Sequence, residues 1–284
     1  MVPQGKNRSL FKERIVKVDK KKLPFITANF VGRACNYSLK PFDWGKADEA
    51  TQRLFQSYAF EKEFSELMTI IADAGFKTIE LWTAHLNYGK ATQEQIQKAK
   101  QILERYELSV YSYSGSLGNS EKELDQSFTL AQTMGAKILA GGLDTSLLDK
   151  AYKLCQGYKI RFAFENHPNR ETPEKIKDTI GNRGDWFGAC VDTGWFATYD
   201  IDASEAIIEL QNNLFHIHLK DITARGKHET CALGDGIVDI PAVIKTLRKI
   251  DYDGCISIEH EPEYHDPINE IKKSLGRLYQ WLKS

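Results

Sequence analysis

The most constraining feature of this sequence is a regular alternation of short apolar strands with amphipathic helices, which begins near Leu23 and continues toward the end of the chain. Parallel strands joined by helices cross over right-handedly, and eight such units close into a barrel. The pattern therefore predicts an α/β fold, a single (β/α)₈ TIM barrel. The strands are expected at residues 24–30, 77–81, 108–113, 137–141, 160–165, 187–192, 214–219 and 255–259. The helices are expected at residues 60–74, 94–106, 120–134, 146–155, 173–180, 203–210, 241–250 and 267–282.

The length of 284 residues suits one such barrel, which we expect to form a catalytic domain over residues 23–284. Residues 1–22 are expected to be a basic leader segment. An open doubly wound sheet is the competing fold, but no GxGxxG motif follows the first strand, so its dinucleotide-binding version has no support. The first βα loop, residues 31–59, is long and aromatic, which is typical of a lid or binding loop, or of packing against the barrel rim.

Helix boundaries carry their own signals in the sequence. Thr92 and Thr172 stand where an N-cap is needed, because their hydroxyl oxygens can accept a hydrogen bond from a free backbone N–H. Gly75, Gly135 and Gly254 follow predicted helices, where a left-handed residue often ends the helix.

Composition excludes several classes of protein. Lys and Arg total 38 against 39 Asp and Glu, so a net charge of −1 disfavours a nucleic-acid coat. No run of about 18 apolar residues is present, so no membrane partner is expected. The five cysteines are scattered without a CxxC pair, which argues against a disulfide scaffold and for a reducing compartment. Because residues 1–22 also lack the apolar core of a signal peptide, we expect a cytoplasmic protein.

Ionisable side chains stand where four consecutive predicted strands end. They are Glu165, Asp192, His218 and Glu259. Strand ends meet at the C-terminal face of a TIM barrel, and neighbouring strands lie about 4.8 Å apart, so the four can converge on one cation. One carboxylate alone usually caps a helix or anchors a loop, whereas four groups in register favour a metal site. Three carboxylates and one imidazole suit Mn²⁺, Mg²⁺, Co²⁺ or Fe²⁺ better than structural zinc.

Other polar residues lie near the same predicted strand ends. His216 and Lys220 share a strand face with His218, because side chains alternate with period two. His216 is expected either to contact substrate, to bind the metal or to support a ligand, and Lys220 either to hold a substrate oxygen or to pair with an acid. His85 and His167 are further candidates for substrate contact.

Five segments of the sequence together resemble the xylose-isomerase-like family of TIM barrels over roughly residues 23–284. They are FENH at 164–167, VDTG at 191–194, HIHLKD at 216–221, GDG at 234–236 and SIEH at 257–260. This is the broad sugar phosphate isomerase and epimerase group, which includes ketose 3-epimerases. The resemblance implies that the four strand-end residues bind one divalent metal, commonly Mn²⁺. It also implies that Glu165 and Glu259 transfer protons.

Two departures from the family pattern bear on the substrate. Trp195 stands where many members carry a substrate-binding histidine, so an indole surface is expected there. Arg225 or His228 is expected to replace an arginine that ketose epimerases often carry after the seventh strand. The aromatic first loop, residues 82–85 and Trp195 are also similar to members that act on 3-keto-glycosides.

The function expected from the resemblance is that of a metal-dependent sugar isomerase or epimerase in carbohydrate metabolism. It would remove a proton next to a carbonyl through a metal-stabilised enediolate. A 3-keto-glycoside lyase, including a C-glycoside-cleaving subunit, is the alternative enzyme, and a sugar-binding or inactive partner protein is the alternative without catalysis. A DNA-repair endonuclease of this fold is disfavoured by only seven histidines and a near-neutral charge. The sequence leaves open whether the chain forms homo-oligomers.

Overall fold

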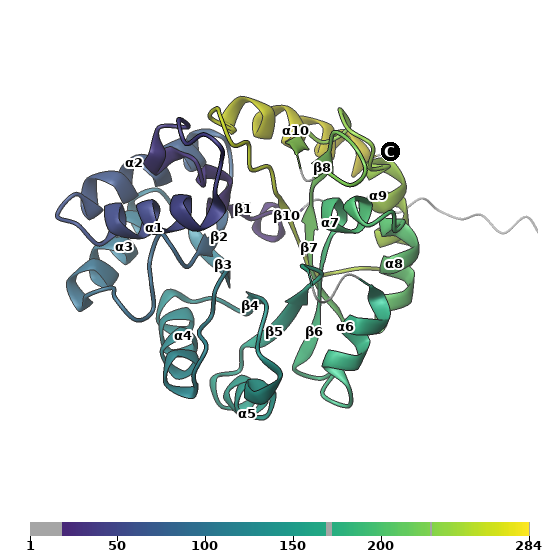
Figure 1. Ribbon diagram of the computed structural model, residues 1–284, viewed down its shortest axis with the longest axis horizontal. Coiled ribbons are helices and arrows are strands. Elements are labelled where there is room, and N and C mark those ends of the chain that lie inside the picture. The colour runs from purple at the N-terminus through teal and green to yellow at the C-terminus, as the bar shows by residue number, and fades with distance from the viewer. Residues whose placement is uncertain (1–18, 169–171, 228, 284) are drawn as a thin grey trace, which may run out of the picture.

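Eight parallel strands close into a barrel at the centre of the molecule (Figure 1). The computed structural model of the chain describes residues 19–168, 172–227 and 229–283. Around the barrel the strand order is β1-β10-β7-β6-β5-β4-β3-β2, and the predicted TIM barrel is therefore confirmed. The strands are β1 (Phe25–Ile26), β2 (Thr78–Trp82), β3 (Ser109–Ser114), β4 (Ile138–Gly141), β5 (Arg161–Glu165), β6 (Phe187–Asp192), β7 (Leu214–Leu219) and β10 (Cys255–Ile258). The predicted leader at residues 1–22 lies almost entirely outside the described residues.

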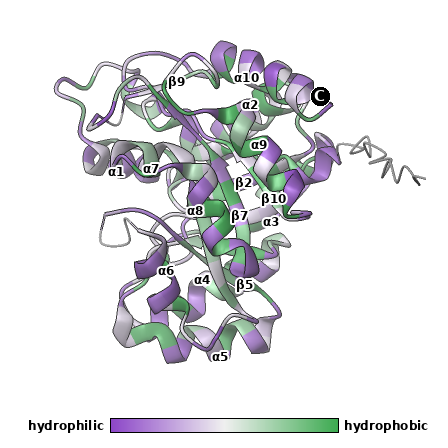
Figure 2. Ribbon diagram, turned by 90° about the vertical axis from the view of Figure 1, so that its right-hand side faces the viewer, coloured by the Kyte–Doolittle hydropathy of each residue, from purple (hydrophilic) through white to green (hydrophobic). Residues whose placement is uncertain are grey.

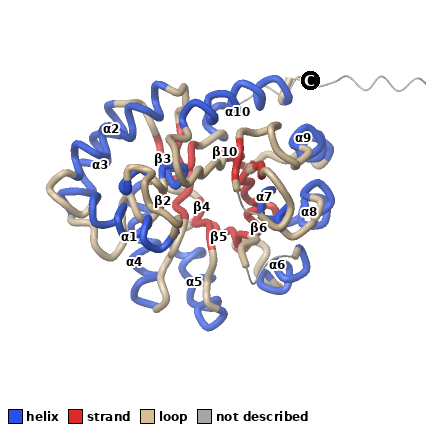
Figure 3. The backbone as a smooth tube through the Cα atoms, turned by 45° about the horizontal axis from the view of Figure 1, so that its top comes forward, coloured by secondary structure: helices blue, strands red, loops and turns tan. Residues whose placement is uncertain are grey.

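Helices form an outer ring around the strands (Figures 1 and 3). Those predicted from the sequence are α2 (Phe60–Asp73), α3 (Gln93–Arg105), α4 (Glu121–Met134), α5 (Leu148–Tyr158), α6 (Pro173–Ile180), α8 (Ala203–Leu210), α9 (Ile240–Lys249) and α10 (Ile268–Trp281). Two helices, α1 (Trp44–Phe55) and α7 (Thr193–Thr198), were not predicted, nor was the antiparallel pair β8 (Asp221–Ile222) and β9 (Thr230–Cys231). None of the described helices is long and apolar enough to cross a membrane.

Most of the predicted helix boundary signals are confirmed. Thr92 caps α3 in a capping box with Gln95, and the Thr172 hydroxyl accepts a hydrogen bond from the backbone of α6. Gly75 and Gly135 both have positive φ angles after their helices, at 91° and 84°. The prediction for Gly254 is wrong, because α9 ends earlier and the left-handed residue after it is Asp251, with a φ of 50°.

The first strand is shorter than predicted. Only Phe25–Ile26 pair as β1, and Thr27–Phe30 form a 3₁₀ helix. The Asn29 side chain takes over the contact with β10, since its amide donates to the Ile258 carbonyl at 3.1 Å and accepts from the His260 N–H at 2.9 Å. Further along, the expected loop at residues 31–59 contains α1, which buries Ala47, Thr51 and Phe55.

The main hydrophobic core lies between the strands and the encircling helices. Hydrophobic residues follow the strands, and polar residues cover much of the outer helix surfaces (Figure 2). On α2, for example, Phe64, Leu67 and Ile71 are completely buried. The barrel interior is different, because charged and polar side chains such as Glu80 and Lys220 are buried there. Buried charges are unfavourable unless they are paired, so these side chains mark the barrel interior as a candidate functional site.

Candidate active site

The four predicted ligands meet at the C-terminal face of the barrel, which we call the mouth. Each presents a nitrogen or oxygen atom, and these atoms all lie within 4.8 Å of one another. They come from the ends of β5, β6, β7 and β10, and the Cα atoms of Asp192 and His218 are partners in the β6–β7 ladder. The four residues are 7%, 0%, 2% and 6% exposed in the order Glu165, Asp192, His218 and Glu259. The predicted convergence is thus present in the structure.

Three carboxylates around one imidazole form a donor set that fits a hard divalent cation. His218 Nδ1 lies 2.9 Å from Glu165 Oε1 and 2.9 Å from Glu259 Oε2. Two of the buried carboxylate oxygens face cationic groups, since Asp192 Oδ2 lies 2.9 Å from Lys220 Nζ and Glu259 Oε2 lies 2.9 Å from His218 Nδ1. Oxygens that already face positive charge are suited to a metal ligand role.

Asp192 is oriented by the short helix that follows it. Its Oδ1 caps α7 by accepting from the backbone of Gly194 at 2.8 Å and of Trp195 at 2.9 Å. This capping leaves Oδ2 to face the ligand cluster. Asn166 was not predicted as a site residue. Its side-chain amide accepts a hydrogen bond from the backbone N–H of Asp192 at 2.7 Å and donates one to the backbone carbonyl of Asp192 at 2.9 Å. Asn166 therefore holds the ends of β5 and β6 together beside the site.

Lys220 is buried at the mouth among carboxylates. Its Nζ lies 2.9 Å from Asp192 Oδ2, 3.2 Å from Glu259 Oε1 and 3.2 Å from Glu261 Oε2. Burial alone would lower the pKa of Lys220, but these three negative neighbours outweigh it and hold the pKa well above its ordinary value. Lys220 therefore carries a positive charge next to the ligand set, and Glu261 is a site residue that sequence reasoning missed.

The pKa values of the predicted carboxylate ligands shift in different directions. Burial raises the pKa of Asp192 to about 6, although the Lys220 ammonium opposes the shift. Burial would also raise the pKa of Glu165, but His167 and His218 together hold it well below its ordinary value. For Glu259, Lys220 and His218 outweigh burial and lower the pKa to about 2. The two glutamates are thus ionised at neutral pH.

His218 carries a proton under the same conditions. Burial would lower its pKa, but neighbouring Cys190 and the acids Glu80, Glu259 and Glu165 raise it well above the ordinary value. A metal ion must displace a proton of His218 before a nitrogen of this imidazole can bind the metal.

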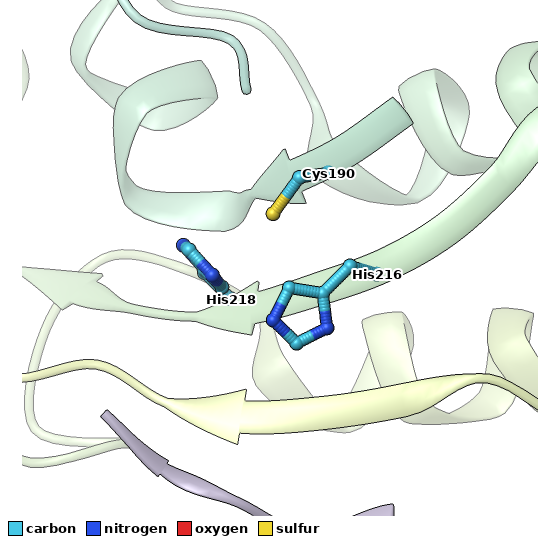
Figure 4. Close-up of side chains that lie close together, drawn as sticks. All are labelled: Cys190, His216 and His218. Atoms are coloured by element: carbon cyan, nitrogen blue, oxygen red, sulfur yellow. The ribbon is translucent and has the colours of Figure 1, made fainter. Parts of the chain in front are cut away.

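A second layer of polar side chains lies below the ligands, inside the barrel. Figure 4 shows His216 and His218 side by side on β7, with the Cys190 sulfur pointing toward them from β6. Glu80 from β2 completes this layer, with Oε1 3.0 Å from His218 Nε2 and Oε2 against His216. The other ring nitrogen of His216 faces the Cys255 sulfur. His216 is completely buried, so its placement favours the supporting role over the predicted substrate contact.

Of the remaining predicted substrate contacts, His167 and Trp195 lie at the mouth. His167 is half exposed, and its Nε2 lies 3.2 Å from Glu165 Oε2. Its ring centroid is 5.2 Å from that of Trp195, which stacks on Tyr199 at 6.0 Å. His85 instead is 1% exposed, packs edge-on against Trp82 and Phe55, and has its pKa lowered by burial to about 3. Its Nδ1 lies 3.0 Å from the Thr27 hydroxyl, and contact of His85 with a substrate stays a prediction.

The loop after β7 holds the last two predicted contacts. Arg225 is exposed, pairs with Asp200 at 2.8 Å and lines a small hollow of about 190 Å³ that includes none of the four ligands. His228 lies outside the described residues. Arg225 therefore adds no group to the cluster of four, and the proposed substrate contact of His228 stays a prediction.

Aromatic residues of the first loop, which the sequence predicts to be a lid, a binding loop or rim packing, lie beside β2 and β10. Trp44 packs edge-on against Trp82 with their centroids 5.9 Å apart, and Phe42 bridges Trp44 to Tyr264 at 6.3 and 6.4 Å. Trp44 and Tyr264 are 42% and 48% exposed. Because Trp82 ends β2 and Tyr264 follows β10, this exposed aromatic surface lies at the same end of the barrel as the ligands.

A model of the xylose isomerase-like TIM barrel family matches residues 68–283, which include all four ligands. The chain belongs to this family. A curated relative, an uncharacterized protein from Methanocaldococcus jannaschii, is 28% identical over 147 residues. That match covers 49% of this chain and 48% of the relative, so the chain spans about half the length of the curated protein it matches.

Solved structures of similar fold include two sugar epimerases. A D-allulose 3-epimerase from a Methylomonas species, in complex with D-allulose, has a TM-score of 0.67 at 14% identity, covering 92% of this chain and 97% of that one. A 3-keto-D-glucoside 4-epimerase from E. coli has a TM-score of 0.62 at 16% identity, covering 76% and 94%. A xylose isomerase-like protein from Mycobacterium smegmatis, in complex with magnesium, has a TM-score of 0.64 at 15% identity, covering 78% and 89%. At these identities the likeness concerns the fold.

Proposed function

We propose that this chain is a divalent-metal-dependent sugar isomerase or epimerase that acts by removing a proton next to a carbonyl. One observation carries the proposal: Glu165, Asp192, His218 and Glu259 bring their ligand atoms within 4.8 Å of one another at the mouth. Mn²⁺ is our first choice of metal, with Mg²⁺, Co²⁺ and Fe²⁺ as alternatives, because the donor set is rich in oxygen. When bound, the cation would polarise the substrate carbonyl and offset the charge of an enediolate.

The two glutamates are the proposed acid and base. Each has an oxygen 2.9 Å from His218 Nδ1, so they flank the imidazole from different strands. Both have lowered pKa values, so each can accept a proton at neutral pH. One glutamate would take the proton from carbon, and one would return it. Return to the opposite face of the same carbon gives an epimer. Return to the neighbouring carbon, with the proton of the adjacent hydroxyl moved to the former carbonyl oxygen, gives an isomer.

Lys220 and His167 are proposed to orient the substrate. The Lys220 ammonium is already placed against Asp192 and Glu259, where it can donate to an oxygen of a bound sugar. His167 contacts Glu165 and is half exposed, so it can reach a hydroxyl at the rim. Both residues lie beside a proposed proton-transfer group or ligand, which is where orientation of the reacting carbon matters most.

A carbohydrate is the proposed substrate, and the aromatic groups at the mouth bear on its kind. Trp195 with Tyr199 offers an aromatic face on one side, and exposed Trp44 with Tyr264 offers another. Aromatic faces suit the apolar faces of sugars or an aglycone. This observation favours 3-keto-glycosides as a second substrate class. In a lyase acting on them, the same proton removal would be followed by loss of the substituent at the β carbon.

The cellular setting is proposed from the cysteines. All five are free, two of them at intermediate burial, which agrees with a reducing cytoplasm. A small sugar is the expected partner.

The test combines metal analysis with proton exchange. Purified protein is expected to hold about one divalent metal per chain and to exchange a carbon-bound proton of D-allulose, D-tagatose or a 3-keto-glucoside with D₂O. Glu165→Gln should lose the exchange, and Glu209→Gln, which alters an exposed acid paired with Lys177, should keep it. If metal-loaded protein binds a sugar but exchanges no proton, the chain is a sugar-binding protein and not an enzyme.

A further inference from the structure

We propose that Glu80 is a positioning residue that fixes His218 in the orientation and tautomer needed to bind the metal. The inference rests on the proposed function, and it assigns a role to a buried acid that the reaction scheme does not use. Glu80 lies on β2, separated from β7 around the barrel by β1 and β10. It is completely buried, and a buried carboxylate is unfavourable unless donors surround it.

Donors surround Glu80 on both of its oxygens. Oε1 lies 3.0 Å from His218 Nε2. Oε2 accepts from the Ser257 hydroxyl at 3.0 Å and contacts His216 Nε2. Since three side chains hold the carboxylate, its two oxygens have fixed positions inside the barrel.

The tautomer of His218 follows from these contacts. A neutral imidazole carries its proton on one nitrogen and a lone pair on the other. A carboxylate only accepts hydrogen bonds, so Glu80 keeps a proton on Nε2. Nδ1 faces the carboxylates of Glu165 and Glu259, each 2.9 Å away, and is the nitrogen whose proton a cation bound beside them would replace. Glu80 therefore directs the metal-binding nitrogen of His218 toward the other proposed ligands.

The side chains that contact Glu80 are themselves held in place by strand pairing and hydrogen bonds. The Cα atoms of Ser257 and His218 are partners in the β7–β10 ladder, as are those of Cys255 and His216. His216 uses one nitrogen for Glu80 and the other for Cys255. Cys190, His216 and His218 also offer ligand atoms within 4.8 Å of one another. The existing partners of His216 favour a support role for this layer over a second metal site.

The experiment measures Mn²⁺ affinity by calorimetry in wild type, Glu80→Gln and a matched control. Removal of an outer partner of a metal-bound histidine typically weakens metal binding about 10–100-fold, and we expect this loss for E80Q. Ser112 is the control position, because it opposes Glu80 in the β2–β3 ladder and its buried hydroxyl has no hydrogen-bond partner among the described residues. Ser112→Ala should keep wild-type affinity.

A second readout reports the tautomer directly. Protein labelled with ¹⁵N-histidine and loaded with Zn²⁺ should show His218 with a protonated Nε2 and a metal-bound Nδ1, and E80Q should lose this single pattern. Metal bound through Nε2 in wild type, or an E80Q variant with unchanged affinity and ring signals, would overturn the role of Glu80. If E80Q does not fold, Ser257→Ala removes one donor to Glu80 and should weaken binding about fivefold; unchanged binding there would also overturn it. A wild-type protein that binds no metal would instead overturn the proposed function.

Discussion

The two halves of the barrel contribute different kinds of side chains to the mouth. The described strands β5, β6 and β7, with the residue after β10, supply all four proposed ligands at the mouth. Strands β1 to β4 supply one charged side chain, Glu80, which contacts His218 from below. The first half instead contributes aromatic surface through Trp82 and the neighbouring Trp44. Charged side chains are thus concentrated in the second half, where they can neutralise one another, whereas the first half adds one buried acid and an exposed aromatic surface.

The largest expected effect comes from Glu165 and Glu259, the two glutamates of the second half that we propose to transfer protons. Glu165→Gln and Glu259→Gln should each lower the turnover number by two to four orders of magnitude, about the contribution of a general acid or base. Melting temperatures should change little, because the amide has the same shape. Steady-state kinetics with metal-saturated protein measure the effect. A variant with most of its activity left would remove that glutamate from the scheme.

Metal affinity separates the ligands from the first-half support. Asp192→Asn should weaken Mn²⁺ binding more than the loss of about 10–100-fold expected when Glu80 is altered, because it removes a ligand rather than an outer partner. Asparagine still caps α7, so stability should be kept, whereas Asp192→Ala should also lose about 1 kcal/mol from the cap. Calorimetry and thermal unfolding measure the two effects. Equal affinities for D192N and E80Q would break the division between ligand and support.

The pH dependence of metal binding tests the electrostatics of the second half. The Asp192 pKa of about 6 means that this carboxyl is protonated below pH 6, and the protonated form cannot bind a cation. Affinity should therefore rise as pH increases through 6 and fall as pH decreases through it. The raised pKa of His218 adds a proton that is released on binding near pH 7. Calorimetry in buffers of different ionisation enthalpy counts the protons, and an affinity that stays constant from pH 5 to 8 would contradict this account.

The smallest effects are expected at the aromatic surfaces. Trp195→Ala in the second half should raise KM for any accepted sugar about 5–10-fold with little change in kcat, as loss of an aromatic contact implies. Trp44→Ala in the first half should matter for a glycoside with an aglycone and not for a free ketose. Comparison of KM for both substrates in both variants decides which half meets the sugar. Identical KM changes would show that the two surfaces do not divide the substrate.

The barrel and the ligand set follow from patterns that are local in the sequence. Alternation of strands and helices predicted the fold, and strand ends predicted Glu165, Asp192, His218 and Glu259. The fold is confirmed and the four side chains converge as expected, because the C-terminal ends of parallel strands must meet at one face, while their role as ligands stays a prediction. Side-chain alternation also placed His216 on the ligand-bearing face of β7, but it does not give depth. His216 therefore looked as available as Lys220, although it stands two residues before His218 on β7 and contacts Glu80 and Cys255 inside the barrel.

The residues that sequence reasoning missed depend on closure of the barrel. Glu80 stands between Ile79 and Leu81 in an apolar strand, and its partner His218 is 138 positions away. Glu261 becomes a site residue only because Lys220 reaches it across β7 and β10. The one sequence signal for Glu80 is its residue type, since a lone acid in the middle of an apolar strand needs a buried partner.

Asp192 sets the position of two parts of the site at once. One of its oxygens faces the ligand cluster, and the other holds the first turn of α7, where the backbone of Trp195 is bonded at 2.9 Å. The Asp192 side chain thus fixes the position of the Trp195 indole relative to the ligand cluster. Exchange of the residue at position 195 alters the surface that a substrate meets and leaves the backbone bond to Asp192 in place. Substrate preference can therefore diverge at this position while the chemistry stays constant.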